Sequence, residues 1–201
     1  MPCMRPECGP ACRAPVVSIL RAQASTHNPK IWYNSGMRII ARAEWVEAKD
    51  GKSDVSFIAA MERRRLTSLE KAALGVAWKV QNEAGCVPDA VVFASRWGEI
   101  GTTLKLMRQM FEEHEMSPAG FSNSVHNAAP GHFSLLTKNH APYTAIAAAE
   151  RTYEMGMQEA SAYSGRVLFV YAEEATPEMY RPHFQDVQEA HAVAVMMENE
   201  E

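Results

Sequence analysis

Serine, histidine and glutamate side chains that could carry acid–base or nucleophilic chemistry gather in the second half of the chain. Ser122, Ser124 and His126 are close in sequence, but alternate residues of one short segment do not by themselves form a nucleophile, a base and an orienting acid in mutual contact. No G-x-S-x-G motif accompanies them. We therefore interpret these residues as structural and expect no hydrolase triad.

Metal-binding patterns are equally weak. His126, His132 and His140 lie in the loop-like stretch 117–142, whose composition leaves their mutual placement open. Neither H-E-x-x-H nor C-x-x-C occurs, and the cysteines at positions 3, 8 and 12 have no fourth ligand close by. We expect no metal site and no cofactor.

Glu150 is the remaining candidate, in the Ala-rich stretch 144–162, which predicts a helix. A carboxylate near the start of a helix interacts favourably with the helix dipole, and this structural role alone explains the residue. A chemical role for Glu150 depends on the residues around it.

Composition excludes several classes of function. The 201 residues are 47% hydrophobic and carry a net charge of −4, without a basic stripe for nucleic acid or a polybasic segment for a membrane surface. No apolar run approaches the roughly 18 to 20 residues of a membrane-spanning helix, and the N-terminus lacks a signal-peptide pattern. Cysteines crowded at one end suit a reducing compartment, so we expect a cytoplasmic protein.

The elements that must position these residues are those of an α/β protein. Residues 1–36 contain five prolines and are expected to be a disordered or wrongly assigned extension before a domain of residues 37–201. A half-buried strand begins at Met37, and buried strands are predicted at 91–95 and 167–171. Helices are predicted at 68–82, with Thr67 and Glu70 as a capping box, and at 104–113. Buried strands alternating with helices indicate an α/β sandwich.

The stretch 117–142 carries the most specific pattern. Its anchors resemble, in order and spacing, the N-terminal half of a β-ketoacyl synthase of the thiolase fold: Ser117, Pro118, Asn127, Gly131, His132 and Pro142. The segments MERRRLTSLEKAAL and FSNSVHNAAPGHF are similar to a narrower group, the short chain length factors of aryl polyene gene clusters. The resemblance implies half of a thiolase-like fold, with a mixed β-sheet flanked by helices.

Two departures from the ketosynthase pattern imply that the chain is not an enzyme. The position of the catalytic cysteine falls on Glu150 or, with a gap, on Ile146 or a neighbouring alanine, and residues 144–153 contain no cysteine. Acyl transfer in that family needs a thiolate. The catalytic histidines of ketosynthases belong to a C-terminal half that this chain lacks, so His126 and His132 are expected to be framework residues.

The resemblance further implies a partner. We expect a heterodimer with a full-length β-ketoacyl synthase, which would supply the catalytic residues and the contact with acyl carrier protein. Residues expected to face the partner or its acyl tunnel are Arg96 and Trp97, after the buried strand, and Ala119, Gly120 and Phe121, in the loop after Ser117-Pro118. Two alternatives stay open: a decarboxylating or hydrolytic enzyme that uses Glu150 with His126 or His132, and a homodimeric scaffold.

Overall fold

The computed structural model describes residues 36–183 and 189–200, and its centre is a five-stranded sheet. The strands follow the spatial order β1-β5-β4-β2-β3. Their bounds are β1 (Met37–Val46), β2 (Ala90–Ala94), β3 (Tyr143–Ile146), β4 (Gly165–Glu173) and β5 (His191–Asn199). Strand β2 runs parallel to β3 and β4, whereas β5 is antiparallel to β1 and β4. The sheet is mixed and flanked by helices, and the predicted fold class is confirmed.

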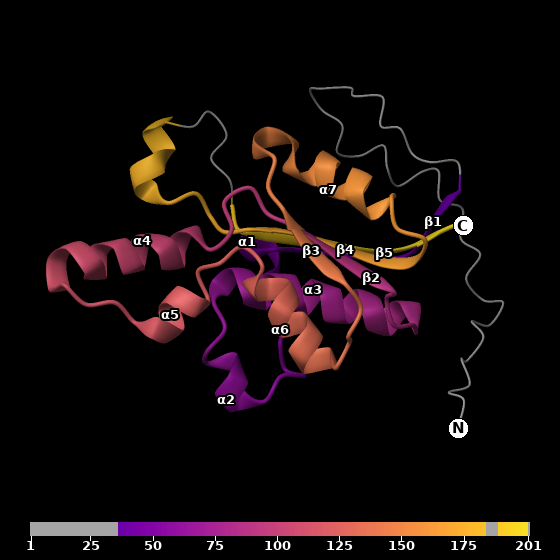
Figure 1. The fold of residues 1–201 in the computed structure, drawn as a ribbon, viewed down its shortest axis with the longest axis horizontal. Coiled ribbons are helices and arrows are strands. Elements are labelled where there is room, and N and C mark those ends of the chain that lie inside the picture. The colour runs from indigo at the N-terminus through magenta and orange to yellow at the C-terminus, as the bar shows by residue number, and fades with distance from the viewer. Residues whose placement is uncertain (1–35, 184–188, 201) are drawn as a thin grey trace.

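Helices cover both faces of the sheet (Figure 1). Helices α3 (Ser68–Ala84) and α6 (Ala128–Thr137) pack on one face, and α7 (Thr152–Ala160) packs on the other. Successive side chains of a strand point to opposite faces, so Phe93 joins the core under α3 whereas Val92 joins the core under α7. The strands at the centre are therefore apolar on both faces.

One part of the chain extends away from this sandwich (Figure 1). It consists of α4 (Ile100–Arg108), the π-helical turn η1 (Gln109–Glu113) and α5 (Pro118–Ser122). Helices α4 and α5 pack against each other. We call residues 100–122 the α4–α5 arm. The remaining short helical elements among the described residues are α1 (Glu47–Asp50), α2 (Ala60–Arg63) and the 3-10 turns η2 (Ala149–Arg151) and η3 (Glu178–His183).

The helix predicted at 68–82 and the strands predicted at 91–95 and 167–171 are confirmed as α3, β2 and β4. The capping box is also present, because the backbone N–H of Glu70 donates to Thr67 Oγ1 at 3.0 Å and Thr67 N–H donates to Glu70 Oε2 at 2.7 Å. The half-buried strand that begins at Met37 is β1.

Three expectations need correction. The single helix predicted at 144–162 is wrong, because β3 ends at Ile146, a 3-10 turn η2 (Ala149–Arg151) follows, and α7 begins only at Thr152. Pairing with β2 stabilises an extended backbone there despite the alanines. The helix predicted at 104–113 is α-helical only as far as Arg108. The tail, to which the sequence assigned no element, contributes β5 between β1 and β4.

The expectation for residues 1–36 falls, apart from Gly36, outside the described residues. Within the two stretches that the structure describes, no helix combines the length and apolar character required to cross a membrane.

Candidate functional site

The carboxyl ends of the parallel strands β2, β3 and β4 meet at one edge of the sheet. Ala94, the last residue of β2, lies opposite Ile146 of β3 and Tyr171 of β4. In α/β sheets ligands bind outside such carboxyl ends. Arg96 and Glu150 lie in the segments that leave β2 and β3, and Glu173 is the last residue of β4, so the fold brings together residues far apart in the sequence.

Glu173 organises the loop that follows β2. Its buried carboxylate accepts hydrogen bonds from the backbone N–H of Arg96, from Trp97 N–H at 3.4 Å and from Ser95 Oγ at 3.2 Å. Burial raises the pKa of Glu173 above its usual range, although these hydrogen bonds pull the pKa back down. No sequence pattern singles out Glu173, because the last residue of an apolar strand carries no motif.

Arg96 and Trp97 lie in the loop after β2, as predicted, and Arg96 contacts Glu150. An Arg96 guanidinium nitrogen lies 2.7 Å from Glu150 Oε1, and the guanidinium stands over the Trp97 ring at 4.8 Å. Trp97, which is half-buried, also stacks on Tyr180 of η3 at 6.5 Å between ring centroids. Glu150 is an exposed ion-pair partner in the 3-10 turn before α7, so the expectation that it lies in the first part of a long helix is wrong.

A sharp junction connects β3 to α7. Ile146 is the last residue of β3, and Ala149 has φ +50°, a left-handed conformation that alanine rarely adopts. Thr152 stabilises the junction with two hydrogen bonds. Its Oγ1 accepts from Ala148 N–H at 2.9 Å and donates to the Ala149 carbonyl at 2.7 Å. Residues 147–149 of this strained turn are all alanines.

His126 packs against the same junction. Its Nε2 donates to the Ile146 carbonyl at 3.2 Å, and its ring is tilted against Phe93. A Cβ on Gly98, whose φ is +57°, would lie 2.6 Å from His126 Nδ1. Only glycine therefore fits position 98 while His126 supports the end of β3.

His132 lies elsewhere, on α6, with its Nδ1 2.7 Å from Oε1 of the fully buried Glu70. This hydrogen bond raises the pKa of His132. His140 is exposed. No group of histidine, cysteine, aspartate and glutamate side chains suited to a metal ion occurs within residues 36–183 and 189–200. The cysteines at positions 3, 8 and 12 fall outside these residues.

The family-motif residues around the arm have structural contacts. Ser117 caps α5, with its Oγ accepting from Gly120 N–H at 3.2 Å, and Pro118 occupies the first helical position. The Asn127 carbonyl accepts from Gly131 N–H at 3.1 Å in the first turn of α6. The carbonyl of Pro142 accepts from the N–H of Val91 at 3.0 Å, at the start of the β2–β3 pairing.

Ala119, Gly120 and Phe121 form part of helix α5, so the expectation of a loop at this point is wrong. Phe121 is 57% exposed. It belongs to a set of exposed apolar side chains in or next to the arm, which also includes Met107, Met110, Phe111 and Met116. The arm therefore presents a methionine- and phenylalanine-rich surface, which is typical of a contact with another molecule.

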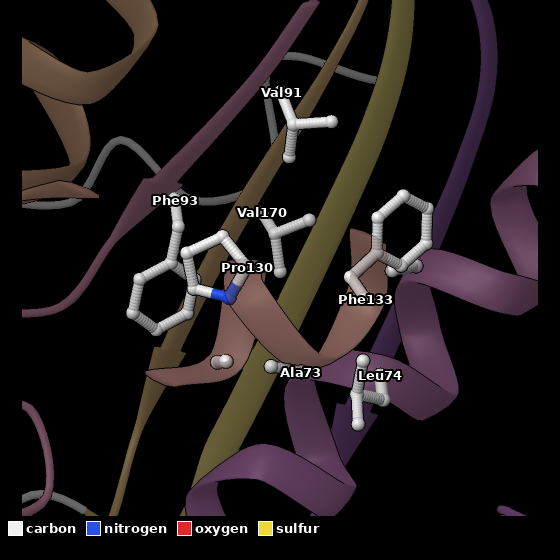
Figure 2. A pocket seen from close by; sticks show the side chains of 9 residues that line it. Ala73, Leu74, Val91, Phe93, Pro130, Phe133 and Val170 are labelled. Atoms are coloured by element: carbon white, nitrogen blue, oxygen red, sulfur yellow. The ribbon is translucent and has the colours of Figure 1, made fainter. Parts of the chain in front are cut away.

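A narrow apolar crevice lies between α3, α6 and the sheet (Figure 2). Phe93, Pro130, Phe133 and Val170 are among its lining residues, and its volume is about 10 Å³. It holds no more than about one small group and has no polar lining, so it is not an acyl-binding tunnel.

Comparisons with known proteins show the family to which this fold belongs. The sequence model described as "Beta-ketoacyl synthase, N-terminal domain" matches residues 39–201. No curated protein gives a significant match. Among solved structures, one similar chain belongs to the complex of the ketosynthase ApeO with its chain length factor ApeC from Xenorhabdus doucetiae. The TM-score is 0.73 at 21% identity, and the alignment covers 83% of this chain and 80% of that chain.

Two larger proteins share the fold at lower identity. The ishigamide ketosynthase/chain length factor gives a TM-score of 0.53 at 12% identity, with 67% of this chain and 42% of that chain covered. The ketosynthase from module 6 of the bacillaene synthase of Bacillus subtilis gives 0.60 at 9% identity, with coverages of 82% and 37%. The chain thus spans less than half the length of these two proteins. By fold and by sequence match, the chain belongs to the β-ketoacyl synthase family and consists mainly of that family's N-terminal domain.

Proposed function

We propose that this protein is a noncatalytic, chain-length-factor-like subunit that pairs with a full-length β-ketoacyl synthase. One observation carries the proposal: the junction where a strand turns sharply into a helix, a position typical of a nucleophile, contains only alanines at residues 147–149. Alanine has no group that can accept an acyl chain. Condensation would therefore need a cysteine from another subunit.

The lost nucleophile position is best placed within residues 147–149. The sequence left Glu150, Ile146 and a neighbouring alanine open for this position. Ile146 pairs in β3 and its carbonyl is bound to His126, whereas Glu150 extends to Arg96. The left-handed Ala149 lies between them, at the bend itself.

The similar structures support a ketosynthase as the partner, because two of them are described as a ketosynthase with its chain length factor. We propose a heterodimer in the cytoplasm, within an aryl polyene pathway of the type II polyketide or fatty-acid-like kind. The ketosynthase would bind acyl carrier protein, and this chain would meet the carrier protein only indirectly.

The α4–α5 arm is the surface we assign to the partner's acyl tunnel. Ala119 and Gly120 are small, and Phe121 is exposed. A Cβ on Gly120 would already lie 3.1 Å from Leu106 Cδ2, so a large side chain there would push α5 away from α4. Gly120→Phe should shorten the products made with the ketosynthase, and Leu135→Ala, an exposed change on α6 outside the arm, provides a control for non-specific effects. Unchanged product length in Gly120→Phe would remove α5 from the tunnel.

Co-expression with the ketosynthase encoded beside this chain tests the pairing. We expect one chain of each kind to co-purify and to give a single mass by native mass spectrometry. Separate elution, or a homodimer of this chain that excludes the ketosynthase, would contradict the proposal. Release of carbon dioxide from malonyl-loaded carrier protein by the isolated chain would instead favour a decarboxylating enzyme.

A further inference from the structure

Three carboxylates converge where the α4–α5 arm joins the sheet. Glu99, 3% exposed, directly precedes α4 and accepts hydrogen bonds from Thr67 Oγ1 at 2.8 Å and Thr102 Oγ1 at 3.4 Å. Glu70 belongs to α3 and is fully buried. Glu174 follows β4 and accepts from Gly101 N–H at 2.8 Å. The base of the arm is thus attached to α3 through the buried Glu99 and to the end of β4 through the partly buried Glu174.

Few buried apolar side chains contribute to this attachment of the arm. Among the described residues of α4, only Leu106 is buried. Near the other end of the arm, Asn123 Nδ2 donates to the Arg65 carbonyl at 3.2 Å. The backbone before and inside the first turn of α4 contains Gly98, with φ +57°, and Gly101, where a Cβ would lie 2.9 Å from Glu174 Oε2. These glycines allow close approach of the carboxylates and give the base of the arm backbone freedom.

The groups that face Glu99 offer hydroxyls and further acids. Thr67 and Glu70 face it from α3, Glu174 from the end of β4 and Thr102 from α4 itself. Glu70 itself is in contact with the imidazole of His132 from α6. Desolvation, reinforced by the charges of Glu70 and Glu174, raises the pKa of Glu99 to about 8. Burial also raises the pKa of Glu174.

We propose that Glu99 is a proton-dependent latch, which in its neutral form holds the base of the α4–α5 arm against α3 and in its ionised form releases the arm. A neutral Glu99 adds no charge to the cluster, and its unprotonated oxygen still accepts from Thr67 Oγ1. An ionised Glu99 would place a negative charge in a desolvated position beside two other acidic side chains, and movement of the arm would return that charge to water. The latch does not depend on which partner the arm contacts.

The sign of the pH dependence follows from proton binding. The latched state keeps the proton up to about pH 8, whereas a released, hydrated Glu99 loses it near its ordinary value of about 4.3. The equilibrium constant for release should therefore rise by up to about tenfold per pH unit between about 5 and 8 and then level off. Over the same range Glu99→Gln, which cannot ionise, should show a clearly smaller rise, because only the shifted Glu174 then remains at the base of the arm.

Hydrogen exchange of the full chain from pH 5.5 to 8.5, corrected for intrinsic exchange rates, measures this constant. We expect protection of the α4 amides to fall about 30-fold or more between pH 6 and 8. Amides at the centre of α3 should keep their protection. Glu112→Gln, a change on the exposed surface of the arm, should behave like the wild type, whereas Glu99→Gln should lose much less protection than the wild type between pH 6 and 8.

The pH dependence of α4 amide protection in the wild-type chain tests the latch even if Glu99→Gln fails to fold. Protection of α4 that does not change with pH would overturn the latch. So would a parallel loss of protection in α3, because that result indicates global unfolding, or a pH dependence in Glu99→Gln as steep as that of the wild type.

Discussion

Helix α3 and helix α4 differ in where their apolar side chains go. Helix α3 buries residues along its length, from Leu69 to Ala84, against the sheet. In the described part of the chain α4 buries Leu106 alone, and Met107 is about half exposed. The apolar side chains of α3 thus complete the core, whereas most of those of α4 remain on the surface. Stability should depend on the sandwich of sheet, α3 and α7, and partner contact should depend on the arm.

The same truncation in the two regions should give the largest contrast. Phe169 is fully buried in β4 and meets Tyr153 edge-on, whereas Phe111 on the arm is 69% exposed. Phe169→Ala should lower the free energy of unfolding by about 3–5 kcal/mol, because it leaves a cavity. Phe111→Ala should change it by less than about 0.5 kcal/mol. Urea unfolding followed by circular dichroism measures both, and equal losses would abolish the distinction between the regions.

Glycine substitutions should show a smaller contrast. On α7 a Cβ at Gly156 would lie 2.6 Å from Phe169 Cε2 and 2.8 Å from Ala94 Cβ, so Gly156→Ala should destabilise the fold by about 1–3 kcal/mol. On the arm, Gly120→Ala would meet only the mobile end of Leu106 closely, at 3.1 Å, and should change stability by less than about 0.5 kcal/mol. Thermal unfolding of the two variants checks this order, and a reversed order would mean that α7 has room to move.

Loss of a helix cap should also affect the stability of the two regions differently. Thr67→Ala removes the side-chain cap of α3 and should lower the global free energy of unfolding by about 1–2 kcal/mol. Ser117→Ala removes the cap of α5 and should loosen the arm without a measurable global change. Denaturant unfolding gives the global value, and hydrogen exchange gives the local one. A global loss in Ser117→Ala as large as that in Thr67→Ala would show that the arm unfolds together with the core.

The smallest effect concerns the contact between α3 and α6. Because Glu70 raises the pKa of His132, their contact should add stability that is complete below about pH 6.5 and lost as the pH rises through the raised value. Glu70→Gln should return the pKa of His132 toward its ordinary value in a proton NMR titration. Glu115→Gln, an exposed change near the arm, should leave the titration unchanged. An unaltered His132 pKa in Glu70→Gln would remove Glu70 as the cause.

Local signals predicted the elements that local interactions stabilise. The capping box and three-to-four residue spacing predicted α3, and continuous apolar runs predicted β2 and β4. Strand β5 lies far in sequence from β1 and β4, and its pairing with them has no local signature. The alanines before α7 favour helix, but pairing with β2 outweighs that preference at β3.

The candidate site was only partly predictable for the same reason. The placement of Arg96 and Trp97 after a buried strand follows from the sequence, and so does the absence of a cysteine near residues 144–153. The roles of Glu99 and Glu173 depend on contacts with residues 32 and 77 positions away in the chain. A single buried acidic residue has no characteristic spacing in the sequence. Its contacts can be found only when the sheet topology is known.

Reconstituted condensation tests the central proposal most directly. The ketosynthase, this chain and their mixture would each receive acyl-loaded and malonyl-loaded carrier protein, and product formation would be followed by mass spectrometry. The account predicts full activity only in the mixture, with the acyl group carried by the ketosynthase and none bound to this chain. Elongation by this chain alone, or a covalent acyl adduct on it, would contradict the account.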